Sequence, residues 1–279
     1  MLSDAQDELR AEIVDLDARL ERAQLVAEGF GRLLDETSVL VMPNNAEMGA
    51  GSGMWLAAGE VHFADGNALL SNVEWTNGRA AWGTFQVVDE DYTELWWNLY
   101  PGRVWAYLTL TPRTGVAAEI GVQMWNETHP DSPQRDDMFI IDPVALEALL
   151  VLGGAGEVET ELGTVAADSV AAFMLRDPYR EGQGPLERRS IMVDMAARSL
   201  AELAGVDADP LTMLEVLDQL IAERHLIAWS RDPQRQGYWA ALGMDGAMAD
   251  NSLMVSLLNP GGNKLDAYLA VDADLTTTR

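Results

Sequence analysis

Residues 138–165 read MFIIDPVALEALLVLGGAGEVETELGTV, and this stretch decides the fold class. Residues 138–141 form a short apolar run that is typical of a buried strand. Residues 143–152 are typical of a helix, because the proline that opens them is tolerated in a first helical turn. Residues 157–165 then favour a second strand. Strand, helix and strand in succession predict an α/β (α+β) protein, layered as α/β/α around a central mixed sheet.

The segments on either side continue this alternation. Residues 37–42, 54–63 and 68–76 are strand candidates, and Asp65-Gly66-Asn67 and Asn77-Gly78 are strong turn signals beside them. Further along the chain, the patterns predict helices at residues 116–125, 168–175, 186–203, 210–223 and 233–242, and strands at residues 225–230, 253–258 and 267–271.

Residues 1–36 are predicted to form one long helix that precedes the domain. Apolar residues recur near the helical period with charges between them, at Leu9, Ile13, Leu16, Leu20 and Phe30. Such a helix either forms a coiled-coil stalk or packs on the flank of the domain. We expect packing, because Ala23 and Ala27 weaken a coiled-coil seam. No linker rich in Pro, Gly or Ser interrupts residues 37–279, so they are expected to form a single α/β domain.

The charge of the chain excludes several classes of partner. There are 45 acidic and 18 basic side chains, which gives a formal net charge of −27. Nucleic acids and anionic membrane surfaces both need a basic face, so neither is expected as a partner. The chain has no cysteine, which excludes disulfides, zinc-thiolate sites and thiol nucleophiles. No run reaches the roughly 18 apolar residues of a membrane span, so membrane anchoring is expected only through segments outside this sequence.

Two features of the basic residues suggest an anion site. Lys264 is the only lysine, in Gly261-Gly262-Asn263-Lys264-Leu265-Asp266, while seventeen arginines carry the other fixed positive charges. Several of these arginines cluster in an otherwise acidic chain, at Arg176, Arg180, Arg188 and Arg189. Arginine forks suit phosphate or pyrophosphate recognition. The alternative is a solvated mixed-charge helix in which the arginines pair with neighbouring carboxylates such as Asp194.

Tryptophans and histidines are better explained by structure than by chemistry. Seven of the nine tryptophans lie between Trp55 and Trp125, next to carboxylates at residues 89–94. Indole rings beside carboxylates suit sugar binding, but core packing is the favoured interpretation because indoles are usually buried. The three histidines lack the spacing of a metal pair on one helix face, so each is expected to be structural.

Several motifs resemble those of a bacterial, mainly actinobacterial, family known as domain of unknown function four thousand and twelve. They include Asn44-Asn45-Ala46-Glu47-Met48, Gly53, Ile141-Asp142-Pro143 and Asn263-Lys264-Leu265-Asp266, in that order. The resemblance implies an extracytoplasmic domain that is membrane-anchored in the full-length protein through an upstream helix. It also singles out candidate motif residues, which are Asn44, Asn45, Glu47, Gly53, Asp142 and Asp266.

Residues 139–189 show a fainter similarity to the LytR-CpsA-Psr family, in the order strand, Asp-containing turn, helix ending in Gly-Gly, strand, helix and arginine cluster. That family transfers lipid-linked glycopolymers to the cell wall through a pyrophosphate. The similarity implies that Arg176, Arg180, Arg188 and Arg189 face a diphosphate, and that Glu47 or Asp142 holds a divalent cation, Mg²⁺ or Mn²⁺. An Arg-x-Asp element is missing, however, and Gly49 stands where the first family usually has arginine.

These departures favour binding over catalysis. We expect an extracytoplasmic cell-envelope domain that binds an envelope glycan or a lipid-linked pyrophosphate glycopolymer, with no certain cofactor. One alternative is a LytR-CpsA-Psr-like phosphotransferase that attaches glycopolymers to the cell wall, and another is a structural protein-interaction module. Convergence of Glu47, Arg188 and Lys264 on one cleft would favour the enzyme. In that cleft, the ammonium of Lys264 is expected between Asp266 and a phosphate or a buried carboxylate.

Overall fold

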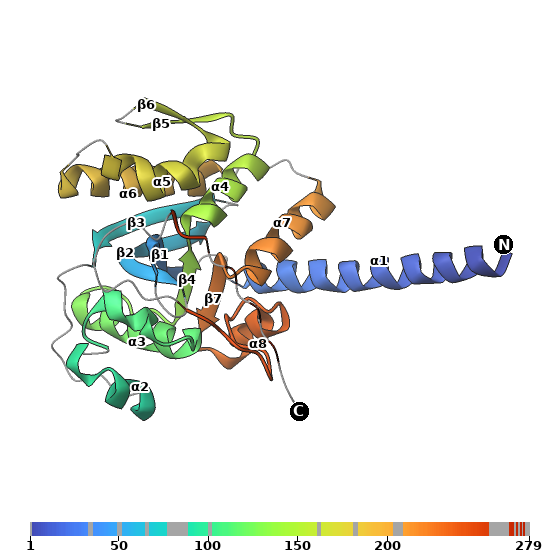
Figure 1. Cartoon of the computed structure of the whole chain (residues 1–279), viewed down its shortest axis with the longest axis horizontal. Helices are drawn as coiled ribbons and strands as arrows, with labels where there is room; N and C mark the ends of the chain where they lie inside the picture. Colours follow the sequence, from blue (N-terminus) through green and yellow to red (C-terminus); the bar gives the residue numbers. More distant parts are fainter. Residues whose placement is uncertain are drawn as a thin grey trace.

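The computed structural model describes residues 2–32, 36–48, 52–64, 67–76, 89–99, 102–160, 163–180, 184–202, 209–256, 268–270, 272, 274 and 276. The side chains of residues 2–5, 8, 44–48, 67, 178–180, 185–189 and 202 lie outside this description. A five-stranded sheet stands between two helical layers, and a long helix extends from the domain (Figure 1).

The central sheet is mixed, as the sequence predicts. Its strands are β1 (Thr37–Met48), β2 (Gly53–Ala64), β3 (Asn67–Trp75), β4 (Asp137–Ile141) and β7 (Leu226–Ser230), in the order β3-β2-β1-β4-β7. β1 and β4 run parallel, and the other neighbouring pairs run antiparallel. Every residue of β4 and of β7 is buried, because helices cover both faces of the sheet at these strands.

Alternate residues of the strands feed two separate hydrophobic cores. Leu40 and Phe139 point to a core that includes α4 (Pro143–Leu152), α5 (Val170–Arg180), α6 (Pro185–Glu202) and α7 (Pro210–Ala222). Val39 and Met138 point to the opposite core, with α3 (Thr114–Thr128) and the 3₁₀ helix η2 (Trp105–Leu110). The short helices α2 (Glu90–Leu95) and η1 (Trp97–Leu99) lie beyond this second layer (Figure 1). The α/β/α layering is therefore confirmed.

The tryptophan-rich segment, residues 55–125, contributes mainly to the hydrophobic core between the sheet and α3. Trp55, Trp105 and Trp125 are each 3% exposed or less. The ring of Trp105 lies between the other two, with a centroid distance of 6.5 Å to each of them. Core packing is thus the correct interpretation for these three residues. Trp97 differs, because it is 71% exposed.

Three helices start with the same dipeptide, Asp-Pro. Asp142, Asp209 and Asp232 are the N-caps of α4, α7 and α8 (Pro233–Ala241), and each side chain accepts a hydrogen bond from a backbone N–H of the first turn. Proline at the first helical position costs nothing there, since its missing N–H would have no helical partner. This local chemistry explains why the predicted starts of these helices agree with the structure.

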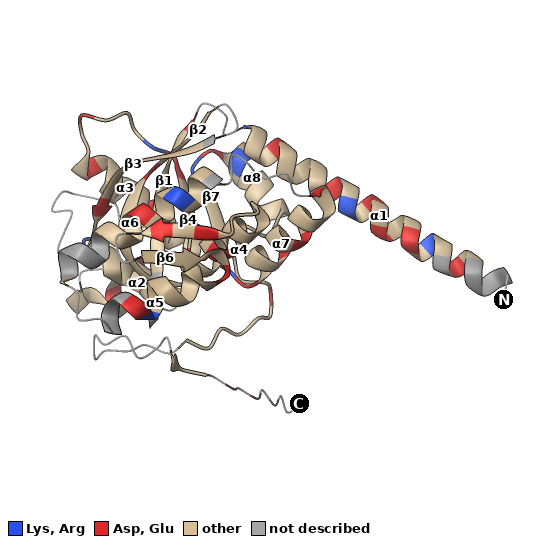
Figure 2. Ribbon diagram, turned by 90° about the horizontal axis from the view of Figure 1, so that it is seen from above, with Lys and Arg blue, Asp and Glu red and all other residues tan. Residues whose placement is uncertain are grey.

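The first helix, α1 (Leu2–Gly31), packs on the domain through its carboxyl-terminal part. Phe30 lies 6.2 Å from Phe139 and 5.5 Å from Trp239, measured between ring centroids. The amino-terminal part projects away from the domain, and Figures 1 and 2 show this projection from two directions. Flank packing therefore describes one end of the helix, and the other end has the form of a stalk. Among the described helices, none is long and apolar enough to cross a membrane.

Three strand predictions are wrong. Residues 157–165 are not one strand but a hairpin of β5 (Glu157–Thr160) and β6 (Gly163–Ala166), which pair as a separate two-stranded sheet. Residues 253–256 are irregular, with Leu253 and Val255 67% and 65% exposed, so their alternation faces no core. Residues 268–270 are not strand either, and the remainder of both predicted segments lies outside the described residues. The helix predicted from residue 168 is preceded by a 3₁₀ turn, η3 (Ala167–Ser169).

Candidate functional site

The four clustered arginine positions share one end of the helical layer. Arg176 and Arg180 lie in the last turns of α5, and Arg188 and Arg189 lie near the start of α6, with a short connection between the two helices. Arg176 is half-buried, while the side chains of the other three lie outside the described residues. Arg198, further along α6, donates to Asp194 at 2.8 Å, as the mixed-charge alternative predicts.

For most of the predicted motif residues, the side chain lies outside the described part of the structure. Asn44, Asn45 and Glu47 lie near the end of β1, but their side chains are not described. Gly53 opens β2 opposite Met48. Lys264 and Asp266 lie outside the described residues. The convergence of Glu47, Arg188 and Lys264 on one cleft therefore stays a prediction.

Asp142 has a well-defined environment. One carboxylate oxygen accepts from the backbone N–H of Ala145 at 2.9 Å, and the other accepts from Nδ1 of His225 at 2.6 Å. These contacts hold the start of α4 against the turn before β7, which is a structural role. Within the described residues, no group of three or more His, Asp or Glu side chains is arranged to hold a metal ion.

A buried polar network around Glu60 lies on the face of the sheet that α3 covers. Glu60 is 3% exposed and accepts hydrogen bonds from Nε of Arg135 at 2.8 Å, Nδ2 of Asn72 at 2.9 Å and Nε1 of Trp125 at 3.2 Å. Burial opposes the charge of this carboxylate, but these hydrogen bonds and the charge of Arg135 hold the pKa of Glu60 below its ordinary value. These hydrogen bonds join β2, β3 and α3 to the segment before β4, which is a structural role.

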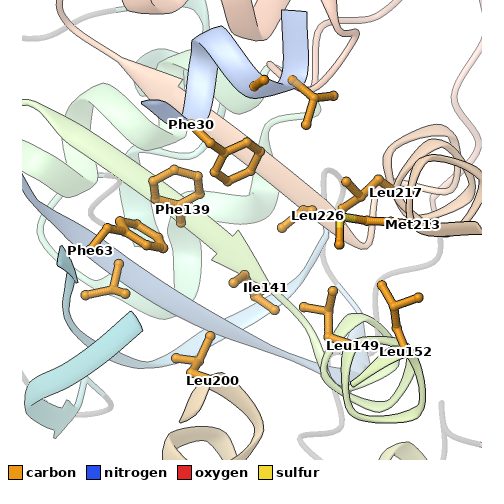
Figure 3. A pocket seen from close by; sticks show the side chains of 13 residues that line it. Phe30, Phe63, Phe139, Ile141, Leu149, Leu152, Leu200, Met213, Leu217 and Leu226 are labelled. Carbon is orange, nitrogen blue, oxygen red and sulfur yellow. The ribbon is translucent and has the colours of Figure 1, made fainter. Parts of the chain in front are cut away.

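The candidate binding site is an apolar cavity of about 300 Å³ between the sheet and the helices α1, α4, α6 and α7 (Figure 3). Among the described residues, the side chains that line it are all hydrophobic, namely Val26, Ala27, Phe30, Val61, Phe63, Phe139, Ile141, Leu149, Leu152, Leu200, Met213, Leu217 and Leu226. A ligand group inside this cavity would find no hydrogen-bond partner among these side chains. The cavity therefore suits hydrocarbon and excludes polar groups.

The periodicity of each element explains how the cavity is lined. Phe139 and Ile141 are alternate residues of β4, so both point to the same face of the sheet. Met213 and Leu217 are four residues apart in α7, which places them on one helix face. The walls thus come from seven separate elements, each of which contributes ordinary core residues. No sequence motif marks them, and sequence reasoning missed the cavity for this reason.

Two ion pairs hold α1 against α7 near the cavity. Arg22 pairs with Asp218 and also donates to the carbonyl of Leu242 at 3.1 Å, and Arg19 donates to Glu215 at 2.6 Å. These arginines lie one to two turns before Val26, where α1 begins to line the cavity. Such partly exposed pairs typically contribute only about 0–1 kcal/mol each. These pairs and the ring contacts of Phe30 attach the α1 wall to the domain.

The cavity is partly open to solvent, so its apolar walls are exposed to water when no ligand is bound. A hydrocarbon occupant would remove this apolar surface from water and add dispersion contacts, and both effects favour binding.

Comparison with protein families gives a match. The model described as "Protein of unknown function (DUF4012)" matches residues 35–179, just over half of the chain. The chain belongs to the DUF4012 family. The matched part of this DUF4012 protein runs from β1 to α5, so it includes the cavity walls supplied by β2, β4 and α4. The walls supplied by α1, α6, α7 and β7 lie outside the match. Comparisons with curated proteins and with solved structures find no match.

Proposed function

We propose that this DUF4012 domain acts in the cell envelope and binds the hydrocarbon tail of an envelope lipid in its apolar cavity. The observation that carries this proposal is the cavity's lining, which consists of hydrophobic side chains from seven elements. Its volume of about 300 Å³ equals roughly ten water-sized volumes of ~30 Å³. A chain segment of about ten carbon groups, acyl or prenyl, matches this space.

A lipid-linked pyrophosphate glycopolymer is the proposed ligand class. The sequence similarity to the LytR-CpsA-Psr family supports it, because the arginine cluster would supply the cations for a pyrophosphate. In α6, Arg188 precedes the cavity residue Leu200 by twelve positions, which is about 18 Å of helix at 1.5 Å per residue. A bound lipid would span this distance with its tail at one end and its head group at the other. Tail binding and head-group binding can therefore be tested separately.

The test of tail binding compares farnesyl pyrophosphate, farnesol and inorganic pyrophosphate by isothermal titration. We expect both farnesyl compounds to bind the wild-type chain. Val26→Phe places a large ring in the cavity, since Val26 is half-buried and lines it, and Leu149→Trp fills it from the opposite wall, so each variant should weaken both ligands at least tenfold. Ala18→Phe is the matched control, since Ala18 is exposed on the same helix and does not line the cavity. Absence of farnesyl binding by the wild type, or unchanged binding by both filled variants, would overturn the proposal.

The same preparation separates binding from catalysis. A binding protein should return farnesyl pyrophosphate intact after incubation with Mg²⁺ or Mn²⁺ and a glycan acceptor, as followed by mass spectrometry. Formation of farnesyl phosphate together with an equal amount of acceptor phosphorylated on a glycan hydroxyl, if it depends on the metal and is lost in Arg188→Ala with Arg189→Ala, would instead favour the phosphotransferase.

A further inference from the structure

The projecting part of α1 carries an exposed hydrophobic stripe. Its residues are Leu9, Ile13, Leu16 and Leu20, with exposed fractions of 58%, 56%, 50% and 58%. Their spacing of four, three and four residues is that of heptad positions d, a, d and a in a coiled coil. Four large apolar side chains in one continuous row leave a substantial hydrophobic area in water, which is typical of an unpaired interface.

A membrane surface does not suit this stripe. The helix carries eight acidic residues and three arginines, so its net charge is −5. Figure 2 shows red acidic segments distributed along the projecting helix. Amphipathic helices that bind anionic lipid have basic polar faces, because the headgroups repel carboxylates. The charge pattern points to another helix as the partner.

We propose that the stripe pairs with the same stripe of a second copy of this chain, in an antiparallel coiled coil. In this register, Leu9 of one copy packs opposite Leu20 of the other, and Ile13 packs opposite Leu16. The twofold axis passes between Ile13 and Leu16, so each of these contacts occurs twice. The next layer places Gln6 opposite Ala23, where a small residue makes room for a longer one.

The charges beside the stripe select the antiparallel orientation. In that register, Arg10 at position e faces Asp17 at position e of the second copy, and Glu12 at position g faces Arg19 at position g. Symmetry makes four pairs of opposite charge. A parallel, in-register pair would instead bring Glu12 against Asp17 twice and would form no pair of opposite charge. Arg19 also donates to Glu215 of its own domain at 2.6 Å, but a guanidinium has enough donors to serve both carboxylates.

The domain leaves room for the second helix. Arg22, Val26 and Gly29 contact the domain from a different side of α1 than the stripe does, as the helical period requires. Among the described residues of α1, Arg19 makes the first polar contact with the domain, and it lies beyond the proposed axis between Ile13 and Leu16. The two domains of the dimer would therefore lie at opposite ends of the helix pair.

Cysteine cross-linking tests the orientation cleanly because the chain has no native cysteine. A differently tagged Leu9→Cys protein and Leu20→Cys protein are mixed and mildly oxidised. The antiparallel register predicts a disulfide between the two tagged proteins. A parallel register predicts disulfides only within each variant, and either that result or the absence of cross-linking would overturn the proposal.

Sedimentation equilibrium tests the interface itself. The wild-type chain is expected to reach the mass of two chains with increasing concentration, and Ile13→Asp with Leu16→Asp should remain monomeric. Val14→Asp is the matched control, since Val14 is 68% exposed on the same helix but lies off the stripe. Arg10→Asp should weaken the dimer at least several-fold, and Arg10→Asp with Asp17→Arg should restore it. A monomeric wild type that co-sediments with phosphatidylglycerol vesicles would assign the stripe to a membrane and refute the dimer.

Discussion

Nδ1 of His225 donates to a carboxylate oxygen of Asp142 across 2.6 Å and so joins the turn before β7 to the start of α4. Glu223 lies 3.4 Å from the other ring nitrogen. The hydrogen bond to Asp142 raises the pKa of His225; burial opposes this, and the charges of Asp142 and Glu223 add to it. The imidazolium is therefore more stable in the folded chain than in the unfolded chain.

This raised pKa predicts a dependence of stability on pH. The stabilisation from His225 is fully present below its unfolded pKa of about 6.5, and it is lost as the pH rises through the higher folded pKa. His225→Asn should lower the free energy of unfolding by about 1–3 kcal/mol at mildly acidic pH and by less at alkaline pH. Urea unfolding of both proteins over this pH range measures the difference. A difference that does not change with pH would show that folding leaves the pKa of His225 unshifted.

The ion pair between Glu60 and Arg135 predicts that removing one charge lowers the stability of the fold more than removing both charges. Arg135→Ala leaves a buried carboxylate without its counter-charge, so it should destabilise the fold by about 3–5 kcal/mol. Glu60→Gln with Arg135→Met removes both charges and keeps the volume, so it should cost clearly less. Thermal and urea unfolding of the two variants at neutral pH give the comparison. An equal loss in both would mean that packing, rather than the unpaired charge, causes the destabilisation.

The elements that the sequence predicts best have their signals within a few residues. The start of α4 follows from Asp142 and Pro143, because a cap and a first-turn proline are local chemistry. The sequence does not predict the change of chain direction between β5 and β6, because apolar and polar residues alternate in the same way along one long strand and along a hairpin. Its remaining signal is Gly163, whose φ of 118° is a conformation that favours glycine.

The cavity could not be predicted by the same reasoning. Periodicity shows that Phe139, Leu149 and Leu217 face a core, but it does not say how closely the facing side chains approach one another. That distance depends on how β4, α4 and α7 pack, which is a property of the whole fold. The anion site rests instead on the clustering of arginines along the sequence, and the side chains of three of the four clustered arginines lie outside the described residues.

The ion pair between Arg22 and Asp218 predicts a kinetic effect on ligand release. Arg22→Met removes one attachment of the α1 wall but keeps most of its apolar stem, so stability should fall by no more than about 1 kcal/mol. Farnesyl pyrophosphate should then dissociate several-fold faster, which stopped-flow displacement can measure. Arg113→Met is the matched control, because Arg113 pairs with Asp89 on the other side of the sheet. Equal dissociation rates in all three proteins would show that ligands do not pass the α1 wall.

The arginine cluster predicts that the head group contributes to affinity. Charge-assisted hydrogen bonds contribute about 1.5–3 kcal/mol each, so farnesyl pyrophosphate should bind at least tenfold more tightly than farnesol. Arg188→Ala with Arg189→Ala should abolish this difference and leave farnesol binding unchanged, because the cavity is about 18 Å away along α6. Arg198→Ala is the control, since Arg198 lies on the same helix and already pairs with Asp194. Isothermal titration of the three proteins with both ligands measures the ratio. If the double variant still prefers the pyrophosphate as strongly as the wild type does, the head group binds elsewhere, and the tail site in the cavity is unaffected by that result.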